Sequence, residues 1–288
     1  MSDIKLFDDI YAISLKRLLR VNNKINKDNV KESVIKTIDF LGIKDFKEID
    51  KCVASLLKAF DTKIGNSSTI SNNDDHEAWY DPNQKRPYWE THKEYLLEIS
   101  KKPIDVVNEI DKSTNEVLGL LESPHREGAW DRRGLVVGNV QSGKTSNFIA
   151  LINKAADAGY KFIVVLSGLT RDLRRQTHER LDDGFFGFNT EQFEYDNFSK
   201  SNILHLGKIR EDKKISRPNT YTSSAMNGDL TKAKLRAAIN THTEDLTLLC
   251  LKKNKTSLQN LIRYVLSSPD VSKDIVVQDK PFTVISYK

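Results

Sequence analysis

The chain has 288 residues, of which 38% are hydrophobic and 30% are charged, and its formal net charge is +5. This composition is typical of a globular protein, and the length allows one large domain or two smaller ones. No apolar run approaches the roughly 18 residues that a membrane-spanning helix needs, so we expect no membrane partner. The mild positive charge permits contact with a polyanion without requiring it.

The N-terminus and the cysteines both bear on where the protein resides. Acidic residues lie among the first residues and no small-residue cleavage site follows, so we expect no secretory signal. Only Cys52 and Cys250 occur, which excludes a disulfide framework. We therefore expect a cytoplasmic protein.

The first part of the chain has the apolar periodicity of helices. Apolar residues recur at helical spacing from residue 5 to residue 63, and Gly42 and Gly65 follow the second and third runs. We expect a helical N-terminal domain over residues 1–64. Residues 65–76 are rich in Ser, Asn and Asp without periodicity and indicate a linker.

Residues 77–124 are expected to form a helical connecting segment. Five aromatic residues gather near its start, around Pro82 and Pro87: Trp79, Tyr80, Tyr88, Trp89 and Tyr95. Such a cluster could stack nucleic-acid bases, but the leucines beside it favour the interpretation that it packs a helix onto its neighbours.

A phosphate-loop motif of the form G-x-x-x-x-G-K-[ST] follows the apolar run Leu135–Val137. Its residues are Gly138, Asn139, Val140, Gln141, Ser142, Gly143, Lys144 and Thr145. The context agrees with the motif, because apolar residues at helical spacing follow Thr145 and a second buried strand is expected over Phe162–Leu166. Gly159 is expected to end the helix in a left-handed conformation.

Each position in this loop has a physical role in holding ATP. Gly138 and Gly143 let successive backbone N–H groups face phosphate oxygens, and the helix N-terminus adds partial positive charge. Lys144 would reach the β- and γ-phosphates, and the Thr145 hydroxyl would bind Mg²⁺. The sequence thus predicts an ATP site with Thr145 as its metal ligand.

The segment after the second strand reads Thr170-Arg171-Asp172-Leu173-Arg174-Arg175-Gln176-Thr177. It resembles the T-R-E-L-x-x-Q motif of superfamily 2 helicases, which touches the nucleic-acid backbone. That resemblance implies DNA contacts from Thr170, Arg171, Arg174, Arg175 and Gln176. The alternative is a solvated helix face whose arginines pair with nearby acids.

The remaining pattern alternates strands with helices. Strands are expected over Asn202–Leu206, Leu246–Leu251 and Phe282–Ile285, a helix over Leu258–Leu266, and a loop over residues 182–200. This alternation predicts an α/β fold: a RecA-like phosphate-loop NTPase domain with a parallel sheet over residues 125–288, preceded by the helical N-terminal region.

The region from about residue 121 to residue 188 resembles the Z-one domain family, whose members are associated with restriction endonucleases. The resemblance is carried by the stretches Trp130–Gly138, Val140–Thr145, Lys154–Tyr160 and Leu173–Thr177. It implies an ATP-dependent, DNA-directed role in phage defence, a helicase-like ATPase core, and other defence-system subunits as partners. It identifies no nuclease residue here.

One departure from such ATPases concerns the acids that hold Mg²⁺ and orient water. They should follow the strand over Phe282–Ile285, where this sequence reads Ser286-Tyr287-Lys288. We therefore expect ATP binding without hydrolysis. The alternative is a non-catalytic nucleotide-binding module that regulates a full-length relative, and a phosphate-loop kinase is disfavoured by the Thr170–Gln176 segment.

Overall fold

The computed structural model describes part of the chain. The described residues are 3–20, 27–43, 46–60, 77–127, 130, 132–135, 144–193, 200–234, 245–266 and 282–286. They form two compact units, one over Met1–Ser68 with Lys93–Lys112 and the other over Thr69–His92 with Ser113–Lys288. None of the described helices is both long enough and apolar enough to span a membrane.

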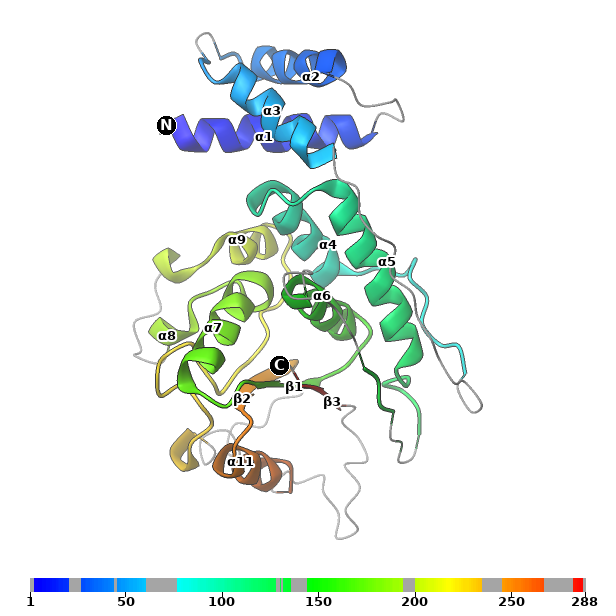
Figure 1. Ribbon diagram of the computed structural model, residues 1–288, viewed down its shortest axis with the longest axis vertical. Helices are drawn as coiled ribbons and strands as arrows, with labels where there is room; N and C mark the ends of the chain where they lie inside the picture. The colour runs from blue at the N-terminus through cyan, green and yellow to red at the C-terminus, as the bar shows by residue number, and fades with distance from the viewer. Residues whose placement is uncertain are drawn as a thin grey trace. The chain divides into compact units, whose positions relative to one another are not determined.

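The first unit is built of helices, as the periodicity predicts. Its elements are α1 (Asp3–Arg20), α2 (Lys27–Phe40), α3 (Ile49–Phe60) and the π-helical turn η1 (Tyr95–Ile99). Apolar residues such as Ile10, Val34 and Leu56 are fully buried where these helices meet (Figure 1). The left-handed Gly42 (φ 68°) follows α2, as expected, and the proposed linker over residues 65–76 lies outside the described residues.

The second unit surrounds a small parallel sheet. Its strands are β1 (Phe162–Ser167), β2 (Thr247–Lys252) and β3 (Phe282–Ser286), in the order β2-β1-β3. All pairing is parallel, with Phe162 opposite Thr247 and Phe282. The strands expected over Phe162–Leu166, Leu246–Leu251 and Phe282–Ile285 are therefore confirmed to within a residue or two.

Helices account for most of this unit. They are α4 (Pro87–Glu94), α5 (Ile104–Leu120), α6 (Lys144–Asp157), α7 (Arg171–Leu181), α8 (Thr190–Phe193), α9 (His205–Asp212) and α11 (Lys255–Leu266), with the π-helical turn η2 (Asp182–Phe186) and the 3₁₀ turn η3 (Lys200–Asn202). α4 and α5 each contribute residues to both units.

The prediction of a RecA-like phosphate-loop domain is wrong. In the described residues the sheet has three strands, and helices dominate. The expected strand over Asn202–Leu206 is a 3₁₀ turn, a single bridge at Ile203 and the start of α9. Leu135, expected in the strand before the phosphate loop, is 87% exposed and outside any strand, while Val136 and Val137 lie outside the described residues. Short apolar runs fit strands and helices equally well, which is why the alternation misled.

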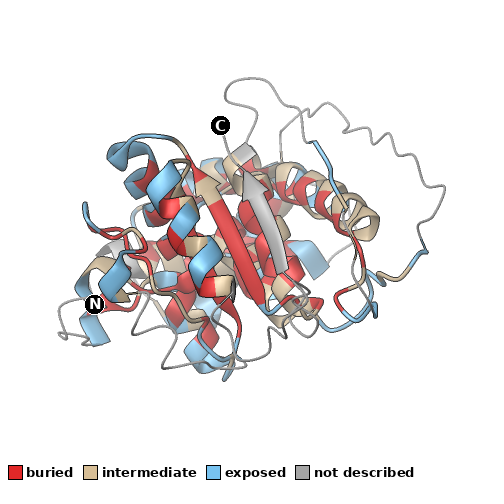
Figure 2. Cartoon of the chain, turned by 90° about the horizontal axis from the view of Figure 1, so that it is seen from below, coloured by how far each residue is buried: buried red, intermediate tan, exposed pale blue. Residues whose placement is uncertain are grey.

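The sheet is buried on both faces because alternate side chains of β1 and β2 point to opposite sides (Figure 2). Ile163 and Val165 face a core that α6 and η2 complete, whereas Phe162 and Val164 face a second core that includes Tyr264 of α11. α6 is thus held against the sheet along its apolar side.

Polar groups are also buried between the helices. Arg210 of α9 is 1% exposed; its Nη2 donates to Asn153 Oδ1 at 2.7 Å, its Nη1 donates to the Phe185 carbonyl, and its guanidinium lies 4.6 Å from the Tyr88 ring centroid. Burial lowers the pKa of Arg210 to about 10. This one cation joins α9, α6, η2 and α4.

Asp157, the last residue of α6, caps the start of α4. Its carboxylate accepts the backbone N–H groups of Tyr88 and Trp89, each at 2.9 Å, and so satisfies donors that lack partners within the helix. Burial raises the pKa of Asp157 from 3.8 to about 6, and the two backbone hydrogen bonds counter only part of that effect.

This raised pKa predicts a pH dependence of stability. Between about pH 4 and pH 6 the folded protein holds a proton on Asp157 that the unfolded chain has lost, so the free energy of unfolding should fall as pH rises through this window. Asp157→Asn should show a shallower fall, because the amide does not titrate. Denaturant unfolding of both proteins at several pH values measures the two slopes, and parallel curves would contradict the assignment.

Candidate functional site

The candidate site lies at the start of α6. This helix begins at Lys144, and the half-buried Thr145 follows it in the first turn. The predicted loop residues Gly138, Asn139, Val140, Gln141, Ser142 and Gly143 lie outside the described residues. The structure therefore places the helical end of the motif and leaves the loop itself a prediction.

The helix expected after the motif is confirmed. Phe148, Ile152 and Ala155 are buried against the sheet, and Gly159 follows the helix with φ of 102°, a conformation that favours glycine. The apolar side of α6 fixes the orientation of the helix and therefore the position of its first turn. A helix N-terminus of this kind concentrates partial positive charge from its unpaired N–H groups.

The predicted nucleic-acid segment forms the start of α7. Thr170 is the N-cap of this helix, and its hydroxyl accepts the Leu173 N–H at 3.2 Å. Arg171, Arg175 and Gln176 are exposed. Thr170 thus has a clear structural role, because its hydroxyl satisfies one of the free N–H groups of the first turn.

Arg174 differs from the other arginines of this segment. It is fully buried, and its Nη1 and Nη2 donate to the carbonyl oxygens of Ser223 and Ala225, with the first of these at 2.5 Å. The prediction that Arg174 meets a DNA phosphate is therefore wrong, because its guanidinium is directed into the protein. It fastens the 223–225 backbone to α7 instead.

Arg180, near the end of α7, was given no site role by the sequence. Its Nη1 donates to Thr145 Oγ1 at 3.0 Å, so α7 supplies a cation to the first turn of α6. Helical periodicity could have shown that it differs from its neighbours: nine residues are about 2.5 turns, which places Arg180 opposite Arg171. The contact itself could not be predicted, because Arg180 and Thr145 are 35 positions apart.

The position of Arg180 is fixed by the turn that follows it. Asn153 of α6 donates to the Gly184 carbonyl in η2 at 3.0 Å. A Cβ on Gly184 would lie 2.9 Å from Ile149 Cγ2, closer than ordinary contacts allow. Only glycine permits this approach, which brings the end of α7 up to α6.

A buried polar network lies on the other side of α7. His178 Nδ1 is 3.2 Å from Asp182 Oδ1 and its Nε2 is 3.1 Å from Thr222 Oγ1, while Thr190 Oγ1 donates to Asp182 at 2.9 Å. The order Thr, His, Asp is that of a nucleophile, a base and an orienting acid. Because these side chains are at most 4% exposed, substrate has no access, and we assign them to holding the loop over residues 220–225 against α7.

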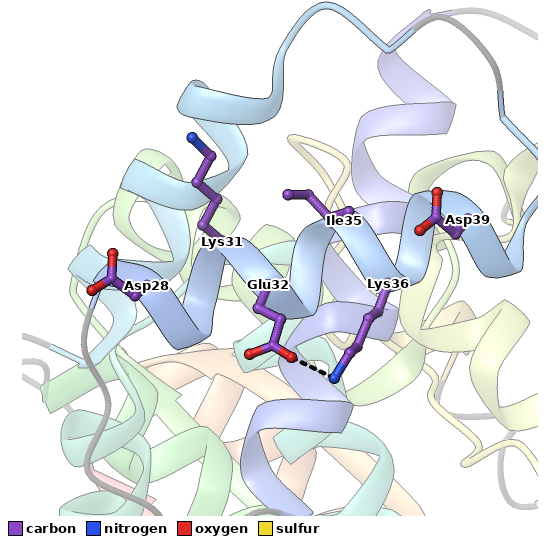
Figure 3. Close-up of a pocket in the computed structure, with 6 residues that line it drawn as sticks. All are labelled: Asp28, Lys31, Glu32, Ile35, Lys36 and Asp39. Carbon is purple, nitrogen blue, oxygen red and sulfur yellow. Dashed lines mark ion pairs between the residues drawn. The ribbon is translucent and has the colours of Figure 1, made fainter.

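A shallow hollow on the outer face of α2 is shown in Figure 3. Its lining residues all come from that one helix: Asp28, Lys31, Glu32, Ile35, Lys36 and Asp39. Lys36 pairs with Glu32 at 2.5 Å and lowers the pKa of that carboxyl, and charges of both signs alternate along the face. These are the features of a solvated helix surface.

The described residues suit an anion better than a metal ion. The first turn of α6 contains no acidic residue, and Arg180 adds positive charge there. No group of three or more His, Cys, Asp or Glu side chains that could hold a metal occurs in the described part of the chain. The three described strands end in Ser167, Lys252 and Ser286, so none ends in a carboxylate. The described side chains of the site thus fit phosphate and do not fit Mg²⁺.

Comparison with known proteins adds nothing to this geometry, because no family model, curated protein or solved structure matches the chain. The resemblance to the Z-one domain family therefore stays a prediction.

The interior position of Arg174 predicts a stability effect. Arg174→Ala removes the donors to two buried carbonyl groups and should reduce the free energy of unfolding by about 2 to 4 kcal/mol. Arg171→Ala, at an exposed position on the same helix, is the matched control and should change stability by less than about 0.5 kcal/mol. Denaturant unfolding measures both, and equal small effects would return Arg174 to the surface.

Proposed function

We propose that this chain binds the phosphates of ATP at the N-terminus of α6. The observation that supports the proposal most is the placement of Thr145, the last residue of the phosphate-loop motif, in the first turn of α6 with the Arg180 guanidinium 3.0 Å from its hydroxyl. A motif hydroxyl, a helix N-terminus and a cation from another helix thus meet at one point. Each favours negative charge.

The roles of the residues follow from their chemistry. The backbone N–H groups at the start of α6 donate to phosphate oxygens, and the Lys144 ammonium supplies a positive charge to the outer phosphates. The glycines at 138 and 143 allow the loop to turn tightly around the ligand. Burial of the apolar side of α6 against β1 keeps the helix N-terminus in place while it carries this charge.

We further propose that α7 meets DNA through the exposed Arg171, Arg175 and Gln176. The exposure of these side chains supports the proposal, and the ion pair of Arg175 with Glu179 at 2.8 Å weakens the contribution of that residue. Contacts of this kind are made to the DNA backbone and carry no sequence preference. A role in phage defence, together with other defence subunits in the cytoplasm, belongs to the same proposal and rests on the Z-one resemblance.

A nucleotide-binding regulatory module is the second candidate function. It is favoured by the lack of a carboxylate at the ends of the described strands and of a metal-holding group among the described residues. Phosphoryl transfer to water depends on such groups to position the metal and the nucleophile. A protein of this type would report on ATP by binding it.

The proposed site predicts a specific effect of removing its lysine. Lys144→Ala should weaken ATP binding by about 2 to 3 kcal/mol, because the variant cannot form the charge-assisted hydrogen bond to phosphate. Lys161→Ala, at an exposed lysine just before β1, should leave the affinity unchanged. Titration calorimetry with ATP compares them, and equal affinities for wild type and Lys144→Ala would contradict the site.

The proposed DNA contacts predict a change in salt dependence. Binding to duplex or single-stranded DNA should be weak and sequence-independent, and Arg171→Ala with Arg175→Ala should reduce the log-log salt slope by about one unit for each arginine that meets a phosphate. Arg263→Ala, at an exposed arginine on α11, is the control. An unchanged slope in the double variant would assign both arginines to the solvated surface.

A further inference from the structure

The hydrogen bond between Arg180 and Thr145 involves the hydroxyl that the motif assigns to a metal ion. The Thr145 Oγ1 atom accepts this hydrogen bond from the Arg180 guanidinium at 3.0 Å. In a metal-dependent site the same oxygen would coordinate Mg²⁺ at about 2.1 Å. Both partners are cations that approach one oxygen.

The charges around this hydroxyl favour the guanidinium over the metal. A divalent ion on Thr145 Oγ1 would lie within a few ångströms of the Arg180 charge, and two cations at that separation repel. A site that holds Mg²⁺ compensates for such repulsion with carboxylates. Here the first turn of α6 has no acid, and the described residues contain no cluster of acidic or histidine side chains that could hold a metal.

Two arginines of α7, Arg175 and Arg180, differ in how their charge is used. Arg175 is neutralised by Glu179, with Nε 2.8 Å from Oε1. The Arg180 guanidinium instead donates to the neutral Thr145 hydroxyl, and within the described ranges it forms no ion pair with a carboxylate. Its full positive charge therefore acts on the N-terminus of α6.

We infer that Arg180 takes the place of the metal ion, so that the site at the start of α6 binds a nucleoside triphosphate that carries no Mg²⁺. This inference rests on the proposed function and specifies its ligand. The guanidinium presents several N–H donors in one plane and can bind two phosphate oxygens at once, which supplies both charge and orientation. Lys144, beside Thr145, adds a second cation without competing for the hydroxyl.

The held position of Arg180 supports this role. The hydrogen bond from Asn153 to Gly184 and the close approach of Gly184 to Ile149 fix the turn immediately after α7 on α6. A cation whose backbone is fixed in this way loses little further freedom when it binds phosphate, and preorganisation of this kind increases affinity.

The test measures ATP affinity by calorimetry in excess Mg²⁺ and in EDTA. Wild type should bind ATP in EDTA at least as tightly as in Mg²⁺. Arg180→Ala should weaken binding in EDTA by about tenfold or more, the usual effect of removing a charge-assisted hydrogen bond. Arg180→Lys should keep part of the affinity, because it retains the charge. Arg175→Ala is the matched control and should behave as wild type.

Each result decides between distinct statements. Wild-type binding that requires Mg²⁺ would overturn the inference and leave the proposed ATP site standing, and so would an unchanged affinity of Arg180→Ala in EDTA. No binding of ATP under either condition would overturn the proposed function itself. Arg180→Gln, which keeps a donor for Thr145 and removes the charge, serves as the second variant. It should lose affinity as Arg180→Ala does if charge is what matters, and full retention of affinity would contradict the role given to the guanidinium.

Discussion

The packing of α6 between the parallel sheet and the turn η2 is the constraint on which the proposed site depends. One side of α6 is buried against β1 and β2, and Ile149 of the same helix meets Gly184 of η2. The sheet therefore sets where Thr145 lies, and η2 sets where Arg180 lies. Because glycine at 184 allows the two backbones to approach, the cation and the hydroxyl meet without a long loop to carry either of them.

The interior of this unit uses arginine and aspartate as fixed structural groups. Arg174 and Arg210 donate to backbone carbonyls, and Asp157 caps α4 from the end of α6. Buried charges of this kind are stable only when their hydrogen bonds are made, so they define one arrangement of the helices strongly. The same chemistry explains why exposure separates the arginines of α7: the buried one holds the fold, while the exposed ones remain open to ligands.

Much of the local structure could be predicted because apolar periodicity reports burial directly. Helix α6 and the strands around Val164 and Leu249 have unbroken apolar patterns, and the structure confirms them. The RecA-like sheet was wrong because Ile203 and Leu204 form an apolar run too short to distinguish a strand from a turn. Residues 182–200 were expected to be a loop, yet Phe185 and Phe186 lie buried in η2 beside glycine and aspartate. The contacts of Arg174 and Arg180 could not be predicted, since each joins positions at least 35 residues apart.

The central claim is that ATP lies between the first turn of α6 and the last turns of α7. Amide hydrogen exchange in EDTA, with and without ATP, tests it most directly because it reports on both helices in one experiment. The account predicts that ATP slows exchange at the start of α6, around Thr145, and near Arg180 at the end of α7 together, in the absence of Mg²⁺. Protection at neither helix, or protection that appears only when Mg²⁺ is added, would contradict it.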